Sequence, residues 1–195
     1  IYFMAVNLMY GSASIASTIS SAAFIYILTI PILSMRIIAE ERKQKTDQLT
    51  LTAPVSIWKI VTGKYLAMAT VLLIPIFVVC LYPLILSAFG TISFVQTYVA
   101  ILGFFLYGLA AIALGLFISS ITESQVIAAV VSFTAIFITY MMDGISNLIT
   151  KSGNVITTFV SKVLSALDFS SRFDDFLNGN FNINAVVYFI TVILV

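Results

Sequence analysis

The chain has 195 residues, of which 61% are hydrophobic and only 9% are charged, and its mean hydropathy is +1.14. This composition excludes a soluble domain with a water-facing surface and predicts an integral membrane protein. A net charge of +1 gives no basis for binding nucleic acid. The lack of histidine and the single cysteine point away from a metal site, a disulfide framework and hydrolytic chemistry.

The chain starts with an apolar segment, residues 1–10, that has the character of the end of a membrane span. Residues 18–38 follow, and a helix of about 20 apolar residues crosses a bilayer. The chain does not begin with methionine, and the apolar run at residues 185–195 is too short to span. We therefore expect one transmembrane domain that is truncated at both ends.

The strongest charge asymmetry lies in residues 36–64, which carry six of the nine basic residues and three of the eight acidic ones. Short loops rich in lysine and arginine stay on the cytoplasmic side of a membrane. We therefore expect this segment to face the cytoplasm in a multi-pass protein of the plasma membrane. On charge alone, the segment could equally be a simple anchor that sets orientation.

We expect the helix of residues 18–38 to continue into water beyond the membrane. The ion pairs Arg36–Glu40 and Glu41–Lys45 would then form on its surface, because residues four apart are neighbours on a helix.

Residues 40–57 should turn the chain back toward the bilayer. Thr46–Ala53 fits a short helix or a strand equally well, and Pro54 bounds it because a proline disfavours helical geometry in the residue before it. Ser56 has the position of an N-cap, so a new helix should begin at about Ile57.

The remaining spans follow from long apolar runs, the first of which contains no charged residue between positions 65 and 122. They are expected at residues 65–88, 96–118 and 125–142, with a last, partial span at 185–195. The second of these spans carries small residues on one side, which allow close helix packing in lipid: Gly108, Ala111, Gly115 and Ser119.

Residues 155–178 combine an apolar stripe with a polar face, which is typical of a helix at the membrane interface. We expect two short helices here on the outer side, the second of them stopped by Gly179.

This order of elements resembles the permease subunit of an ABC-2-type exporter, particularly the gliding-motility-associated branch. The resemblance covers nearly the whole chain and is carried by Pro31, Met35-Arg36, Glu40-Glu41-Arg42, Thr46, Leu49, Thr50–Ser56 and Gly63-Lys64, and by Arg172-Phe173, Phe176, Gly179 and Val187–Phe189. It implies an all-α, polytopic membrane helix bundle with a cytoplasmic coupling helix and short outer helices before the last span. Lys45 departs from the pattern, because the family often has glycine there, and this bears on the tightness of the turn.

The resemblance also implies a coupling helix that contacts a separate ATPase subunit. The candidate coupling residues are Glu40, Glu41, Arg42, Thr46, Leu49, Leu51 and Pro54. The chain would then be a non-catalytic permease with no cofactor or metal of its own, paired with a second copy or a sister permease in the lipid bilayer. It would export an unidentified substrate. The absence of a GxxxxGK[ST] motif places ATP on the partner.

Two other classes of membrane protein fit the sequence less well. An ion-coupled secondary transporter would need charged or broken-helix sites at mid-membrane, and the expected spans hold no charge there. An intramembrane protease or lipid transferase would need a histidine or an acid pair within the spans, which the sequence lacks.

Overall fold

The computed structural model describes residues 15–46, 55–88, 92–150 and 169–194, with side chains omitted for 142–150. These residues form helices and no strand. The helices are α1 (Ala16–Ser34), α2 (Ala39–Lys43), α4 (Ile57–Ser87), α5 (Phe94–Ile121), α6 (Gln125–Thr150), α8 (Phe169–Leu177) and α9 (Ile183–Leu194). The predicted all-α helix bundle is thus confirmed.

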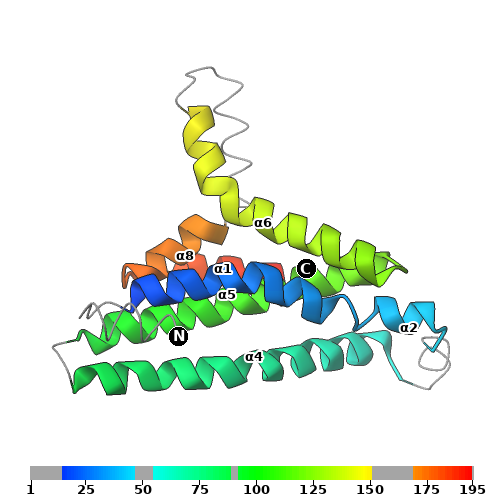
Figure 1. The fold of residues 1–195 in the computed structure, drawn as a ribbon, viewed down its shortest axis with the longest axis horizontal. Helices are drawn as coiled ribbons and strands as arrows, with labels where there is room; N and C mark the ends of the chain where they lie inside the picture. Colours follow the sequence, from blue (N-terminus) through cyan, green and yellow to red (C-terminus); the bar gives the residue numbers. More distant parts are fainter. Residues whose placement is uncertain (1–14, 47–54, 89–91, 151–168, 195) are drawn as a thin grey trace.

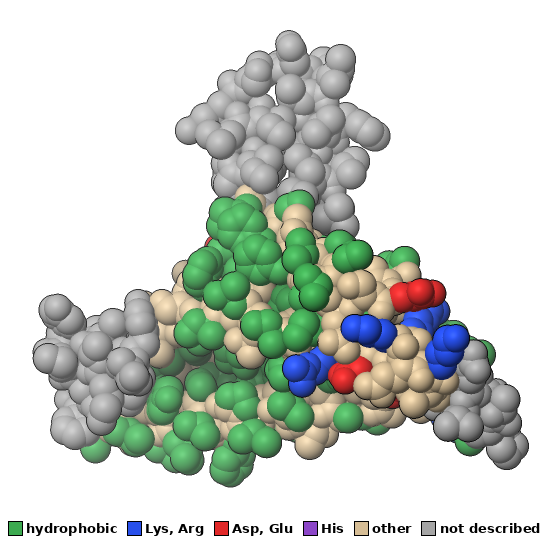
Figure 2. Space-filling view, turned by 45° about the vertical axis from the view of Figure 1, so that its right-hand side comes forward, with side chains coloured by type: hydrophobic (Ala, Val, Ile, Leu, Met, Phe, Trp, Pro, Cys, Tyr) green, Lys and Arg blue, Asp and Glu red, His purple; other side chains and the backbone are tan. Residues whose placement is uncertain are grey.

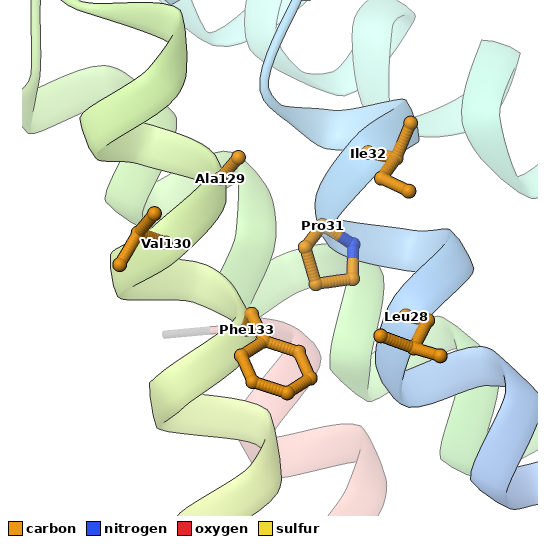
Figure 3. A pocket seen from close by; sticks show the side chains of 6 residues that line it. All are labelled: Leu28, Pro31, Ile32, Ala129, Val130 and Phe133. Atoms are coloured by element: carbon orange, nitrogen blue, oxygen red, sulfur yellow. The ribbon is translucent and has the colours of Figure 1, made fainter.

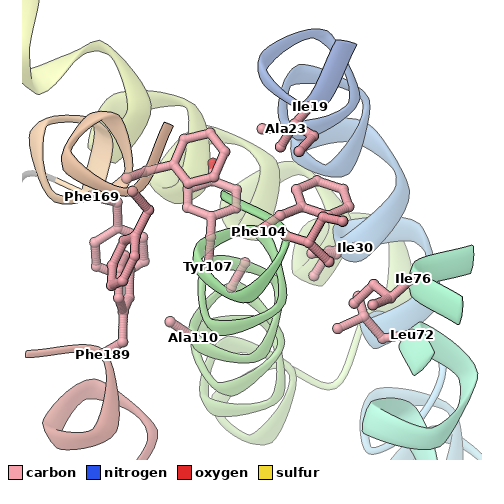
Figure 4. Close-up of a cluster of buried hydrophobic side chains, with 14 of the residues drawn as sticks. Ile19, Ala23, Ile30, Leu72, Ile76, Phe104, Tyr107, Ala110, Phe169 and Phe189 are labelled. Carbon is pink, nitrogen blue, oxygen red and sulfur yellow. The ribbon is translucent and has the colours of Figure 1, made fainter. Parts of the chain in front are cut away.

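Helix α5 is the centre of the bundle. It contacts α1, α4, α6, α8 and α9, and its residues Phe104, Tyr107 and Ala110 are at most 1% exposed. Figure 4 shows these side chains between α1 and α4 on one side and α8 and α9 on the other. Because α5 is apolar all round its circumference, burial on several sides is the arrangement its sequence favours.

Three stretches are long and apolar enough to cross a membrane: residues 16–43, which comprise α1, the turn after it and α2, and residues 57–87 and 94–121. The apolar part of α6, Gln125–Met141, and helix α9 are shorter. Apolar side chains cover much of the face that Figure 2 shows. Phe77 of α4, for example, is 72% exposed. An exposed apolar surface of this extent is suited to lipid, and the chain is a multi-pass membrane protein.

The two ends of the bundle differ in charge. Figure 1 places α2, the start of α4 and the α5–α6 junction at one end, with α8 and the start of α5 at the other. The first end gathers the basic cluster of residues 36–64 together with Glu123. Figure 2 shows this end as the concentration of charged side chains on an otherwise apolar face.

The prediction that the first helix continues beyond Arg36 is wrong. Helix α1 ends at Ser34, a turn occupies residues 35–38, and the short helix α2 starts at Ala39. Pro31 accepts two bonds at this point, from the backbone N–H of Met35 at 3.0 Å and from Ser34 Oγ at 3.3 Å. The regular pattern stops after Met35, because the N–H of Ile37 bonds to the Ser34 carbonyl three residues back at 3.3 Å and the N–H of Ala39 donates to Ser119 Oγ at 3.1 Å.

Candidate functional site

The short helix α2 is attached to the start of α4 by Lys64. The Lys64 ammonium forms an ion pair with Glu41 on α2 and donates a hydrogen bond to the Ile37 carbonyl at 3.2 Å. The Lys64 side chain is 19% exposed and that of Glu41 is 38% exposed. An exposed pair contributes at most about 1 kcal/mol, so the geometric restraint on α2 matters more here than stability.

The predicted pairs Arg36–Glu40 and Glu41–Lys45 do not form. Glu41 pairs with Lys64 instead, and Glu40 accepts a hydrogen bond from Gln44 at 3.3 Å. A surface pair one helical turn apart contributes only about 0.2–0.5 kcal/mol, which is too little to hold a side chain against a better-placed partner.

Helix α2 is also attached to the end of α5, through Ser119. The turn at residues 35–38 leaves the first N–H groups of α2 without partners inside the helix. The N–H of Ala39 is one of these, and it donates to Ser119 Oγ at 3.1 Å. Both residues are 0% exposed, so this bond satisfies a donor that water cannot reach.

The small residues predicted on α5 lie where neighbouring helices come closest. Gly108, Ala111, Gly115 and Ser119 are all buried. A Cβ on Gly115 would lie 2.5 Å from Ser34 Oγ at the end of α1, and one on Gly108 would lie 3.0 Å from Leu72 of α4. These two glycines therefore let α5 approach α1 and α4 closely.

The turn after α2 has a conformation that glycine usually supplies. Lys45 has φ of 56°, its N–H bonds to the Arg42 carbonyl, and the N–H of Thr46 bonds to the Glu41 carbonyl, both at 3.0 Å. This pair of bonds defines a Schellman motif, whose left-handed position favours glycine. Helix α8 ends with the same pair of bonds around Gly179, at φ of 77°. The tight turn thus forms with lysine, at a strain of about 1–2 kcal/mol.

Replacing Lys45 with glycine should stabilise this turn by about 1 kcal/mol, because the left-handed strain disappears. Amide hydrogen exchange of residues 41–46 in the purified protein measures the change, and we expect slower exchange. Lys43→Gly is the matched control, since Lys43 has helical geometry at the end of α2 and glycine in a helix costs about 1 kcal/mol. Equal or faster exchange in Lys45→Gly would contradict the strain we assign.

The structure places part of the predicted coupling site. Glu40, Glu41 and Arg42 lie on α2, and Thr46 Oγ1 donates to the Glu41 carbonyl at 3.3 Å just after it. The remaining candidates, Leu49, Leu51 and Pro54, lie outside the described residues. Their role as contacts for another subunit stays a prediction.

The contacts of Lys64 and Ser119 with α2 were not predicted from the sequence. Lys64 lies in the second turn of the apolar helix α4 with no acidic residue three or four positions away, so its partner had to come from another segment. The isolated charge of Lys64 in an apolar helix could therefore have predicted a contact with an acidic residue of another segment. The bond of Ser119 depends on the break before Ala39, which the sequence does not show.

Two further features bear on the chemistry of the described residues. These residues contain no group of histidine, cysteine and acidic residues that could hold a metal. A groove of about 230 Å³ between α1 and α6 (Figure 3) is lined by apolar side chains alone: Leu28, Pro31, Ile32, Ala129, Val130 and Phe133.

The family model described as "ABC-2 family transporter protein" matches residues 4–194. No curated protein and no solved structure matches this chain.

Proposed function

This chain belongs to the ABC-2 family of transporter proteins, and from that premise we propose that it is the permease subunit of an ATP-driven exporter. The observation that carries the proposal is the family match over residues 4–194, nearly the full 195 residues. Membrane domains of this family serve as permeases of ABC transporters and work with an ABC ATPase subunit. The export direction and the substrate are the finer parts of the proposal.

In the proposed arrangement, residues 36–64 face the cytoplasm and residues 40–57 bind the ATPase. The support is the excess of basic residues at this end of the bundle, which matches the side that retains positive loops. ATP is bound by the partner, since no GxxxxGK[ST] pattern occurs in these residues. A second copy of the chain or a sister permease completes the membrane pathway.

The narrower assignment to the gliding-motility-associated branch is also a proposal. It rests on the sequence pattern of Thr50–Ser56 and Gly63-Lys64, together with the segment from Arg172 to Phe189 before the last span.

Affinity purification of the tagged full-length protein from its native membranes tests the proposal. We expect an ATPase subunit with a GxxxxGK[ST] motif to elute in constant ratio with the chain, and the eluate to hydrolyse ATP. An unrelated tagged protein of the same membranes is the control. The contrary result has two parts: the chain elutes without any ATPase, and an ion gradient alone drives its transport. That result would instead establish an ion-coupled secondary transporter.

A further inference from the structure

We infer that Lys64 and Ser119 are positioning residues that hold α2 against α4 and α5, so that movement of the ATPase-binding loop enters the membrane through these two helices. The inference rests on the proposed function and deepens it, because it names how the same site transmits movement. The short helix α2, which Lys64 and Ser119 hold, carries three residues of the predicted site: Glu40, Glu41 and Arg42.

The direct route from α2 into α1 is interrupted. Between Ser34 and Ala39 the chain leaves the helical pattern of bonds, with the N–H of Ile37 bonded to the Ser34 carbonyl at 3.3 Å. A stiff helix transmits displacement along its axis because each turn is bonded to the next. The turn at residues 35–38 lacks that regular bonding, so contacts from other helices must fix the position of α2.

Lys64 supplies the first of these contacts. Its ammonium joins Glu41 of α2 to α4 and also bonds to the carbonyl of Ile37, which belongs to the turn itself. One side chain therefore fixes both the short helix and the break that precedes it. Lys59, one and a half turns earlier on α4, is exposed and carries the same charge, so it provides a matched comparison.

Ser119 supplies the second contact, to the central helix. Its hydroxyl accepts the buried N–H of Ala39 near the end of α5, only four residues after Gly115 meets Ser34. Helix α5 contacts five other helices and runs to the opposite end of the bundle. A displacement of α2 therefore acts on the helix that the rest of the bundle surrounds.

The test uses the assembled complex with its ATPase and four variants: Lys64→Met and Ser119→Ala, with Lys59→Met and Ser120→Ala as controls. Ser120 is the matched hydroxyl because it bonds to the Phe117 carbonyl of its own helix. Losing either contact should raise hydrogen exchange in residues 36–43 about tenfold, and the controls should leave it unchanged.

The second readout reports coupling and is independent of stability. A single cysteine replaces Val95, an exposed residue at the far end of α5, in a Cys80→Ala background, and its labelling rate is measured with and without ATP. We expect Lys64→Met and Ser119→Ala to keep the ATPase bound and hydrolysing while they lose the ATP-dependent change in labelling. Lys64→Arg, which still donates two hydrogen bonds, should restore it.

Retention of the ATP-dependent change in both variants would overturn the inference. Unchanged exchange of residues 36–43 would also overturn it. If no ATPase binds even the wild-type chain, the proposed function fails, and the exchange experiment still decides whether Lys64 and Ser119 hold α2. Should Lys64→Met not insert into the membrane, Ser119→Ala carries the comparison, with Ser120→Ala as its control.

Discussion

Replacing Gly103 with alanine should destabilise the folded chain by about 1–3 kcal/mol or more, because the new methyl group has no room. A Cβ on Gly103 would collide with the Cβ of Phe176 and lie 2.5 Å from its Cγ. Phe176 is 0% exposed and lies on α8. Its Cβ is fixed to the backbone, so a change of rotamer cannot relieve the collision, and α8 must move away from α5.

Gly63→Ala is the matched control for this prediction. Gly63 lies on α4 with nothing within 4 Å of its would-be Cβ, and alanine in place of a helical glycine contributes up to about 1 kcal/mol of stability. Thermal unfolding of the two purified variants, followed by size-exclusion chromatography after heating, compares them. Gly103→Ala should unfold well below the wild type and Gly63→Ala at or above it. The same unfolding temperature for both would mean that α5 and α8 are not in close contact at this point.

The sequence was sufficient to locate the long helices. Apolar runs without charge predicted spans at 65–88 and 96–118, and the structure has α4 at Ile57–Ser87 and α5 at Phe94–Ile121. Helix α6 starts at Gln125, where the span of residues 125–142 was expected, and extends to Thr150. Composition decides these elements because a chain in lipid must bond its backbone groups internally, which a helix achieves.

Contacts between helices were harder to foresee, because the central helix α5 has no distinct polar face. Gly103 and Gly115 both lie on α5, yet one meets Phe176 of α8 and the other meets Ser34 of α1. The pattern of small residues identified the second side only. Which side of such a helix meets which neighbour depends on the packing of the whole bundle.

The charged end shows the same limit in its ion pairs. Glu41 was assigned to Lys45, four residues away, and it pairs with Lys64 of another helix. Spacing along one helix is a weak guide to ion pairs here, because the Lys64 ammonium finds two acceptors, the Glu41 carboxylate and the Ile37 carbonyl, on another segment.

Replacing Leu49 or Leu51 with aspartate should abolish binding of the ATPase. In the sequence, residues 44–56 are preceded by Glu41 and Arg42 of α2 and followed by the start of α4. Small recognition surfaces combine an apolar centre with a charged rim, and the two leucines are the apolar residues of this loop nearest its middle. Placing a charge in such a centre should weaken binding by about 2 kcal/mol or more, or at least about thirtyfold.

Lys43→Ala is the matched control, because Lys43 is an exposed basic residue at the end of α2. A charge on the rim affects the rate of association more than the stability of the complex, so this variant should retain the ATPase.

The amount of ATPase that co-purifies with each variant, measured at equal levels of the chain in the membrane, tests the coupling role most directly. We expect Leu49→Asp and Leu51→Asp to recover no ATPase and Lys43→Ala to recover nearly the wild-type amount. If the aspartate variants bind the ATPase and support its hydrolysis as the wild type does, residues 40–57 are not the coupling element, and the basic segment serves only to anchor the chain in its orientation.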